Sequence, residues 1–412
     1  MPEFLTLYPP DEARLLLLEK ISLLGQKPIQ IEANASLGCV TAADISAPHP
    51  LPAFSRATVD GFAVRARDTY GISETLPGYL QIIGEVPMGA ASDLELSSGQ
   101  CIIIHTGGML PAGSDAVIML EYTQPVREGE IEIQRAVAYG ENVIHVGEDV
   151  SENQVVIRKG TRIRPAEIGG LMALGITKLT VVQKVKVGLI SSGDEVVSPH
   201  QNPKLGQVRD VNSYSLASLI LQSGGEPIFY GIVQDRFELL QETADRALQA
   251  CDVVVITAGS SASTRDMTAD VIATLGKPGV LVHGVNTRPG KPTILGVCNG
   301  KAIIGLPGNP VSALINGYLF VVPVIEKLLG LIDIFPKPSI RARLTVNLSS
   351  QSGREDWQPV RLVNTVDGWL AEPIFGKSNL IFTLAAATGL IKIHPDANGI
   401  SAGEIVDVIL MT

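Results

Sequence analysis

Cysteine is scarce in this chain, and the few cysteines stand far apart. Cys39, Cys101, Cys251 and Cys298 form no CxxC pair and no Cys/His pair at metal-ligand spacing. The sequence therefore predicts neither a zinc site nor a disulfide framework. Buried free thiols are the expected state.

Basic charge is also in short supply. The chain has 32 Lys and Arg against 42 Asp and Glu, which gives a formal net charge of -10. Because nucleic acids and anionic membrane surfaces are held mainly by clustered Lys and Arg, we expect neither as a partner. An anionic ligand would need a local basic pocket.

Long apolar runs are missing as well. The most apolar window, "ALINGYLFVVPVI" at 313–325, is interrupted by Asn316 and Pro323 and is too short to span a bilayer. The start of the chain lacks a basic segment followed by an apolar core, which argues against a secretory signal. We expect a cytoplasmic protein.

What the chain does have is the length and rhythm of a multidomain α/β protein, since 412 residues exceed the usual size of one core. An N-terminal region at 1–184 is predicted to contain helical and linker parts at 1–50 and 140–184 around a β-rich lobe at 51–139. An α/β domain follows at 185–334. After the proline-punctuated "FPKPS", a small β domain at 335–412 completes the chain.

Two helices are expected in the N-terminal region. "PDEARLLLLEKISLLG" has Pro10 and acids in its first turn, leucines on one broad face and Gly25 to end it. "RPAEIGGLMALG" has Pro165 suited to the first helical position and Gly175 to the end.

The α/β domain is indicated by apolar runs that alternate with helical segments. The runs "KVGLIS", "PIFYGIV", "DVVVITAG" and "AIIGLPG" alternate with expected helices near 212–223, 236–250, 266–275 and 310–329. This alternation predicts a doubly wound parallel sheet covered on both faces. Ligands bind at the carboxyl ends of such strands, so the loops "SSGDE", "TAGSSASTRD", "VNTRPGKP" and "GLPGNPVS" are the candidate sites.

Two of these loops suit an anion. In "GLPGNPVS", Gly308 and Asn309 precede Pro310, a pairing that caps a helix and leaves backbone N–H groups free; a simple strand-to-helix turn is an equally good explanation. In "NTRPGKPT", Arg288 and Lys291 flank a Pro-Gly turn. Such cations are usually only solvated, but their neighbourhood favours a phosphate or oxyanion ligand.

Acids occur at the same sheet edge. Asp194 and Glu195 beside a polyphosphate would be repelled unless a divalent cation such as Mg²⁺ lay between them. Asp235 and Asp266 follow other strands. Each acid alone could merely cap or initiate a helix, but several together indicate a metal and phosphate site.

Five ordered segments resemble one protein family: "PAFSRATVDGFAVRARD", "TGGMLPAGSDAVIMLE", "SSGDEVV", "RPGKPTILG" and "GLPGNPVSAL". They are similar to the MoeA and gephyrin E-domain family, the molybdopterin molybdenumtransferases. The resemblance implies an elongated homodimer with the active site at the subunit interface. It also implies an α/β domain like that of the molybdopterin adenylyltransferases (MogA-like), a split N-terminal region and a C-terminal β-barrel.

The resemblance also implies a reaction and a set of site residues. The family takes adenylylated molybdopterin and molybdate and releases molybdenum cofactor and AMP, with Mg²⁺ or a similar cation. Carried over to this sequence, the catalytic positions are Asp60, Thr106, Asp149 and Glu195; the metal positions are Glu195, Asp235 and Asp266; and the substrate positions are Arg288, Lys291, Pro292, Gly308, Asn309, Ser312, Arg354 and Ser378. Taken without the family, Asp60 would be a plain turn aspartate.

The sequence departs from the family pattern mainly around Asp266. The departing positions are Val59, Ala258, Ser263, Thr264 and Ala269, while Arg288 replaces a common lysine and keeps its charge. Two alternatives stay open: the α/β domain itself adenylylates molybdopterin from ATP, or the chain is a non-catalytic scaffold that binds the cofactor or a partner.

Overall fold

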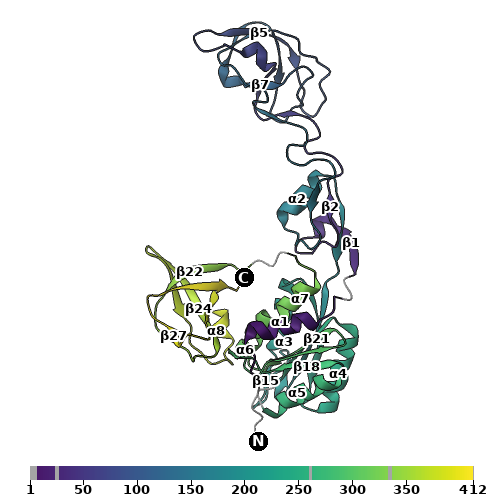
Figure 1. The fold of residues 1–412 in the computed structure, drawn as a ribbon, viewed down its shortest axis with the longest axis vertical. Coiled ribbons are helices and arrows are strands. Elements are labelled where there is room, and N and C mark those ends of the chain that lie inside the picture. The colour runs from purple at the N-terminus through teal and green to yellow at the C-terminus, as the bar shows by residue number, and fades with distance from the viewer. Residues whose placement is uncertain (1–6, 24–26, 259–261, 333–335, 412) are drawn as a thin grey trace. The chain divides into compact units, whose positions relative to one another are not determined.

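The computed structural model describes residues 7–23, 27–258, 262–332 and 336–411, with the side chains of 262–266 excepted. The chain divides into two compact units (Figure 1). Unit 1 comprises Met1–Ala42, Gly160–Arg164 and Lys178–Thr412, and unit 2 comprises Ala43–Lys159 and Pro165–Thr177. Gly25 and Phe335 fall outside the described residues.

A six-stranded sheet forms the centre of unit 1. Its strands follow the order β16 (Gly225–Val233), β13 (Val185–Ser192), β17 (Val253–Ala258), β21 (Lys301–Pro307), β20 (Ile294–Cys298) and β18 (Pro278–His283). The first four strands run parallel, and they are the four apolar runs of the sequence. All residues of β17 are buried, and each large apolar side chain there contributes about 1.5–3 kcal/mol.

The far side of the sheet differs from the prediction of a wholly parallel arrangement. β20 pairs antiparallel with both β21 and β18. A tight turn at Asn299 (φ 52°) and Gly300 (φ 82°) joins β20 directly to β21, and a two-residue connection permits only antiparallel pairing.

Helices cover both faces of the sheet, as predicted. One face packs on α4 (Phe237–Ala250) and α5 (Ala262–Thr274). The other packs on α1 (Pro10–Lys20), α3 (Asn212–Gln222), α6 (Pro310–Asn316), a π-helical turn η4 (Gly317–Val321) and α7 (Val322–Leu328). α1 buries only Pro10, Ala13 and Leu17, so its apolar face is narrower than the leucine run suggested.

The segment Pro310–Leu328 has the length and composition of a membrane span, with 19 residues and a mean hydropathy of 1.5. It is 61% buried inside the protein. Phe320, Val324 and Ile325 belong to the core under the sheet, so the sheet accounts for the apolar character of this segment.

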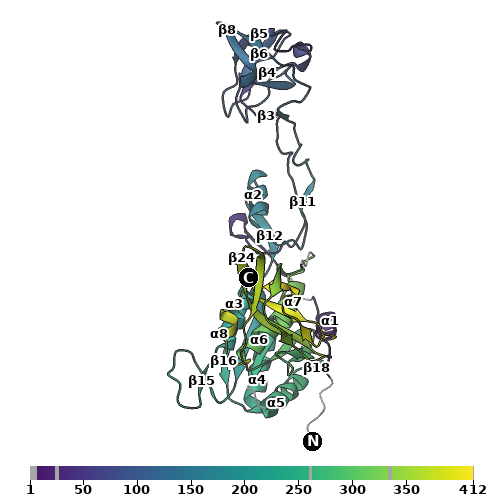
Figure 2. The same cartoon turned by 90° about the vertical axis from the view of Figure 1, so that its left-hand side faces the viewer.

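The remaining short elements of unit 1 frame the sheet. β1 (Pro28–Glu32) pairs with β12 (Lys178–Val182), with η1 (Ala33–Ala35) following β1. β14 (Val196–Val197) pairs with β15 (Val208–Arg209), and the loop at β15 projects from the body of the unit in Figure 2.

A closed five-stranded barrel completes unit 1, drawn in yellow in Figure 1. Its strands are β22 (Ser339–Leu344), β24 (Glu355–Thr365), β25 (Gly368–Pro373), β26 (Gly389–Ile393) and β28 (Ile405–Leu410), and the β24–β26 pairing closes the ring. β23 (Leu348–Ser349) pairs with β27 (Gly399–Ile400), and α8 (Phe382–Ala385) lies between β25 and β26 in sequence. β19 (Thr287–Arg288) pairs parallel with β24, which joins a loop of the α/β domain to the barrel.

Unit 2 is built on its own six-stranded sheet. The order is β7 (Ala116–Met119), β4 (Gly61–Val64), β6 (Gln100–Ile104), β5 (Gly78–Glu85), β9 (Glu130–Ile133) and β8 (Thr123–Arg127), with η2 (Ala66–Thr69) and η3 (Leu120–Tyr122) between strands. The short pairs are β2 (Ile45–Ser46) with β11 (Val155–Ile157), and β3 (Arg56–Ala57) with β10 (Val143–Ile144). α2 (Pro165–Ala173) begins at Pro165 as predicted, and Gly175 (φ 69°) follows its end.

Candidate active site

The carboxyl ends of β13, β17 and β21 meet at one edge of the unit 1 sheet. Ser191 lies opposite Thr257, and Thr257 lies opposite Leu306. The loops that follow these strands therefore start side by side. Two neighbouring cavities open there, and they differ in charge.

The first, which we call the carboxylate cavity, has a volume of about 550 Å³. Among the described residues, its charged lining consists of Glu195, Asp210 and Arg209. Nε of Arg209 donates to the carbonyl of Pro199 at 3.2 Å. Asp210 is 8% exposed and its Oδ1 accepts the backbone N–H of Ser213 at 3.1 Å, which fixes the start of α3. Of the two carboxylates that line the described part of this cavity, Glu195 is therefore the one without such a helix contact.

Asp194 and Asp235 form a hydrogen-bonded group beside this cavity. The hydroxyl of Ser192 donates to Oδ1 of Asp235 at 2.8 Å, and the backbone N–H of Asp235 donates to Oδ1 of Asp194 at 3.2 Å. The side chain of Asp266 lies outside the described residues. Among the side chains that the structure describes, no three His, Cys, Asp or Glu are arranged to hold a metal ion.

The second, which we call the cationic cavity, has a volume of about 860 Å³ and lies between the α/β domain and the barrel. Four cations line it, with Asp356 as the acid: Arg288, Lys291, Arg354 and Lys377. The predicted substrate positions Pro292, Asn309, Ser312 and Ser378 line it too. Gly308 instead lines the carboxylate cavity, while Asn309 and Asn379 line both cavities.

Asp356 organises the cations of this cavity. It is 6% exposed and receives two hydrogen bonds from Arg354, Nε to Oδ1 at 2.6 Å and Nη2 to Oδ2 at 3.1 Å. Nη1 of Arg288 lies 3.7 Å from Oδ2 of the same carboxylate. A bidentate ion pair of this kind fixes the plane of the guanidinium group, so Asp356 sets the orientation of Arg354.

Asn316 holds the loop that carries Lys291 against helix α6. This fully buried side chain donates from Nδ2 to the carbonyls of Pro289 at 3.1 Å and Ser312 at 2.8 Å. Gly290 (φ 113°) passes so close to the amide of Asn316 that a Cβ there would overlap it. One buried side chain therefore joins Ser312 to the loop that carries Lys291.

Asn309 has a different role from the helix cap that the sequence suggested. It occupies the residue before α6, with Pro310 first in the helix, but its side chain makes no capping hydrogen bond. Nδ2 of Asn309 instead donates to Oγ of Ser378 at 3.0 Å. The backbone N–H of Val311 also donates to the Ser378 carbonyl at 3.0 Å, so the Ser378 loop is attached to the start of α6.

Comparison with known proteins assigns the chain to a family. The model of the MoeA N-terminal region (domains I and II) matches residues 8–175, a "probable molybdopterin binding domain" matches 188–327, and the MoeA C-terminal region (domain IV) matches 341–411. A molybdopterin biosynthesis protein of Methanocaldococcus jannaschii is 34% identical over 98% of each chain. This chain belongs to the MoeA family.

Further MoeA relatives agree with that assignment. The molybdopterin molybdenumtransferase of Bacillus subtilis is 32% identical, over 91% of this chain and 88% of its own. The crystal structure of the molybdopterin biosynthesis MoeA protein from Pyrococcus horikoshii OT3 superimposes with a TM-score of 0.86 at 33% identity, covering 98% of this chain and all of its own.

Unit 2 of this MoeA chain contains the other three predicted positions. Oδ1 of Asp60 accepts from the backbone N–H of Thr106 at 2.8 Å and from its hydroxyl at 3.3 Å. Asp149 is exposed, and its backbone N–H donates to the carbonyl of Leu51 at 3.1 Å. No hydrogen bond within the described part of unit 2 links Asp149 to Asp60.

His105 and Glu85 join Asp60, and the sequence did not indicate either. Nε2 of His105 pairs with Oε1 of Glu85 at 2.7 Å, and Nδ1 lies 3.8 Å from Oδ1 of Asp60. His105 could have been found from the sequence, because it is the first residue after β6 and stands immediately before the predicted position Thr106. Asp356 and Asn316 were also missed, and they contact the predicted site residues Arg354 and Ser312. Asp210 was missed too, and it contacts the start of α3 instead.

Proposed function

We propose that these two cavities of unit 1 hold the two substrates of the MoeA reaction. Molybdate would bind in the cationic cavity, and the pyrophosphate of adenylylated molybdopterin would bind in the carboxylate cavity, next to Asn309. The chain is a transferase that inserts molybdenum in molybdenum cofactor biosynthesis, the function that its family membership gives it. One observation supports the assignment of substrates to cavities: a cavity with four cations adjoins a carboxylate cavity, and the two share Asn309 and Asn379.

Molybdate suits the cationic cavity on charge and on hydrogen bonding. The dianion would meet Lys291 and Arg354, with the hydroxyls of Ser312 and Ser378 as neutral donors. Nε and Nη2 of Arg354 already donate hydrogen bonds to Asp356. Because Arg354 and the hydroxyl of Ser378 are held by hydrogen bonds before the ligand arrives, their part of the binding requires little side-chain ordering.

The oxygen donors at the edge of the carboxylate cavity fit a hard divalent cation such as Mg²⁺. Glu195 lines the cavity and Asp235 lies beside Ser192, and Mg²⁺ is typically bound by one or two carboxylates together with substrate phosphates. Bound there, Mg²⁺ would neutralise charge on the pyrophosphate. Glu195 and Asp235 would hold it, with Asp266 as the third proposed ligand.

The chemistry balances without a redox partner. Two Mo–S bonds form between molybdate and the dithiolene, and one molybdate oxygen leaves as water with the two thiol protons. Water adds across the pyrophosphate: its oxygen bonds to the adenylate phosphorus, the P–O bond breaks, and AMP leaves. The residues of the chain supply positioning and charge stabilisation, which can account for much of such a barrier.

The proposal assigns the unit 2 residues to a second subunit. Asp60, with Thr106 donating to it, and Asp149 would act on the nucleophile from the partner of a homodimer. Asp60 is exposed and its Oδ1 is oriented by two donors from one residue, which suits a carboxylate that positions a water molecule. We place the reaction in the cytoplasm.

An assay of the complete reaction tests the proposed function. Purified protein is incubated with adenylylated molybdopterin, molybdate and Mg²⁺, and AMP and molybdenum-loaded product are measured together. We expect both to appear in equal amounts. Production of pyrophosphate from ATP and molybdopterin, with no AMP from the adenylylated substrate, would make the chain an adenylyltransferase instead.

A further inference from the structure

A third cavity lies at the opposite edge of the unit 1 sheet, where the parallel strands begin. It has a volume of about 430 Å³ and is lined by residues next to the starts of β13, β17 and β21. Because the sites described above use the carboxyl ends of the strands, this cavity belongs to neither of them. We call it the lysine cavity.

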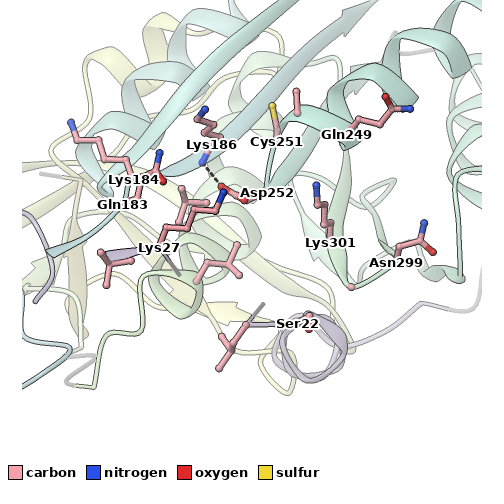
Figure 3. A pocket seen from close by; sticks show the side chains of 16 residues that line it. Ser22, Lys27, Gln183, Lys184, Lys186, Gln249, Cys251, Asp252, Asn299 and Lys301 are labelled. Carbon is pink, nitrogen blue, oxygen red and sulfur yellow. Dashed lines mark hydrogen bonds between the residues drawn. The ribbon is translucent and has the colours of Figure 1, made fainter. Parts of the chain in front are cut away.

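Its charge is unusual for this protein. Its described lining has four lysines, Lys27, Lys184, Lys186 and Lys301, and one acid, Asp252, although the whole chain carries a net charge of -10. Figure 3 shows Lys184 and Lys301 on opposite sides with Asp252 between them. This local excess of positive charge favours an anion in the cavity.

The backbone around the lysines is fixed. The backbone N–H of Gln183 donates to the carbonyl of Lys27 at 2.9 Å, and the backbone N–H of Lys186 donates to Oδ2 of Asp252 at 2.8 Å. The backbone N–H of Asp252 returns a bond to the Lys186 carbonyl at 2.8 Å. Three chain segments are thereby held in register, so the backbone positions of Lys27 and Lys186 do not depend on the ligand.

One lysine has a structural role and three remain available. Nζ of Lys301 donates to the carbonyl of Leu248 in the last turn of α4 at 2.7 Å, where a cation also favours the helix dipole. No ion pair formed within the described ranges involves Lys27, Lys184 or Lys186. The single acid is already engaged by a backbone N–H.

The lining indicates which anion fits. The described lining residues include lysines but no arginine, so they lack the planar fork that matches carboxylates. The same described residues include no aromatic ring on which a base could stack, while Gln183, Gln249 and Asn299 offer amide donors. We propose that the lysine cavity binds a small phosphate or diphosphate anion, held by Lys184 and Lys186 with Lys27.

Inorganic pyrophosphate is the probe, titrated calorimetrically in metal-free buffer. To silence the cationic cavity, all titrations use the Lys291→Gln/Arg354→Gln protein as background. Adding Lys184→Gln/Lys186→Gln should weaken pyrophosphate binding at least about tenfold, the effect of losing charge-assisted hydrogen bonds. Adding Lys159→Gln/Lys204→Gln, which removes two exposed lysines elsewhere, should change it by less than about twofold.

Three results would overturn the proposal. The first is no saturable pyrophosphate binding below about 1 mM in the background protein. The second is equal weakening by the two lysine pairs, which would reveal a general charge effect. The third is a change of oligomeric state, measured by sedimentation, in place of a change in affinity. The Lys184→Gln/Lys186→Gln change in the otherwise natural chain should leave AMP release intact, which separates this site from the proposed function.

Discussion

The two cavities at the carboxyl edge of the sheet share Asn309 and Asn379 but have opposite chemistry. Among the residues that the structure describes, the cationic cavity has four basic side chains and one buried acid, whereas the carboxylate cavity has Glu195 and Asp210 with one arginine. The cationic cavity is built at a junction between two folded parts, and the carboxylate cavity lies almost wholly on the α/β domain. In the proposed assignment, oxyanion capture depends on the barrel and metal-assisted phosphate chemistry depends on the sheet.

Removing the charge of Lys291 should have the largest effect of the changes in these two cavities. Lys291→Ala should lower the rate of molybdenum insertion at low molybdate by about 100-fold, the loss typical for one charge-stabilising donor. AMP release should remain dependent on Mg²⁺. Insertion rates over a molybdate series measure the effect, with Lys159→Ala as the matched control; a rate equal to wild type would refute the oxyanion role.

Loss of the buried acid should have a smaller effect on the same cavity. Asp356→Asn keeps the shape but weakens the two bonds to Arg354, so the KM for molybdate should rise roughly tenfold, as expected for one charged hydrogen bond. The kcat should change less than the KM. Asp367→Asn, an exposed change in the same barrel, is the control, and a fall in kcat alone would contradict a positioning role.

A change confined to the carboxylate cavity should separate the two functions. Glu195→Gln should raise the Mg²⁺ concentration needed for half-maximal AMP release several-fold, since a charged metal ligand becomes neutral. The molybdate KM should stay within about twofold. If Glu195→Gln shifted the molybdate KM and left the Mg²⁺ requirement unchanged, the division between the cavities would be wrong.

The last prediction concerns stability, at the link between loop and helix. Asn316→Ala removes two buried hydrogen bonds to Pro289 and Ser312 and should lower the free energy of unfolding by about 1–3 kcal/mol. Denaturant unfolding measures it. Asn398→Ala, on the barrel surface between β26 and β27, should change stability by less than about 0.5 kcal/mol.

Much of the fold could be read from the sequence because local rules govern it. The four parallel strands are uninterrupted apolar runs, and Pro165 with Gly175 delimits α2. The antiparallel strand β20 was missed because its pairing depends on a tight turn between two buried runs, which have the same composition as parallel ones. The pairing of β19 with β24 spans 68 residues of sequence and leaves no local trace.

The site was predictable only in part, for the same reason. Lys291 and Ser312 stand in turn-rich segments of sequence that follow strands. They could be predicted because ligands bind at the carboxyl ends of parallel strands. Asp356 was missed because alternation on a barrel strand gives no sign that its partner Arg288 belongs to another domain. Asn316 stands in an apolar run, where a polar residue looks like an interruption until its two carbonyl partners are seen.

Anomalous X-ray diffraction from crystals soaked with molybdate tests the central claim most directly. The account predicts one strong molybdenum peak in the cationic cavity, within hydrogen-bonding distance of Lys291, Ser312, Arg354 and Ser378. A molybdenum peak elsewhere on the chain, with this cavity empty at saturating molybdate, would contradict it.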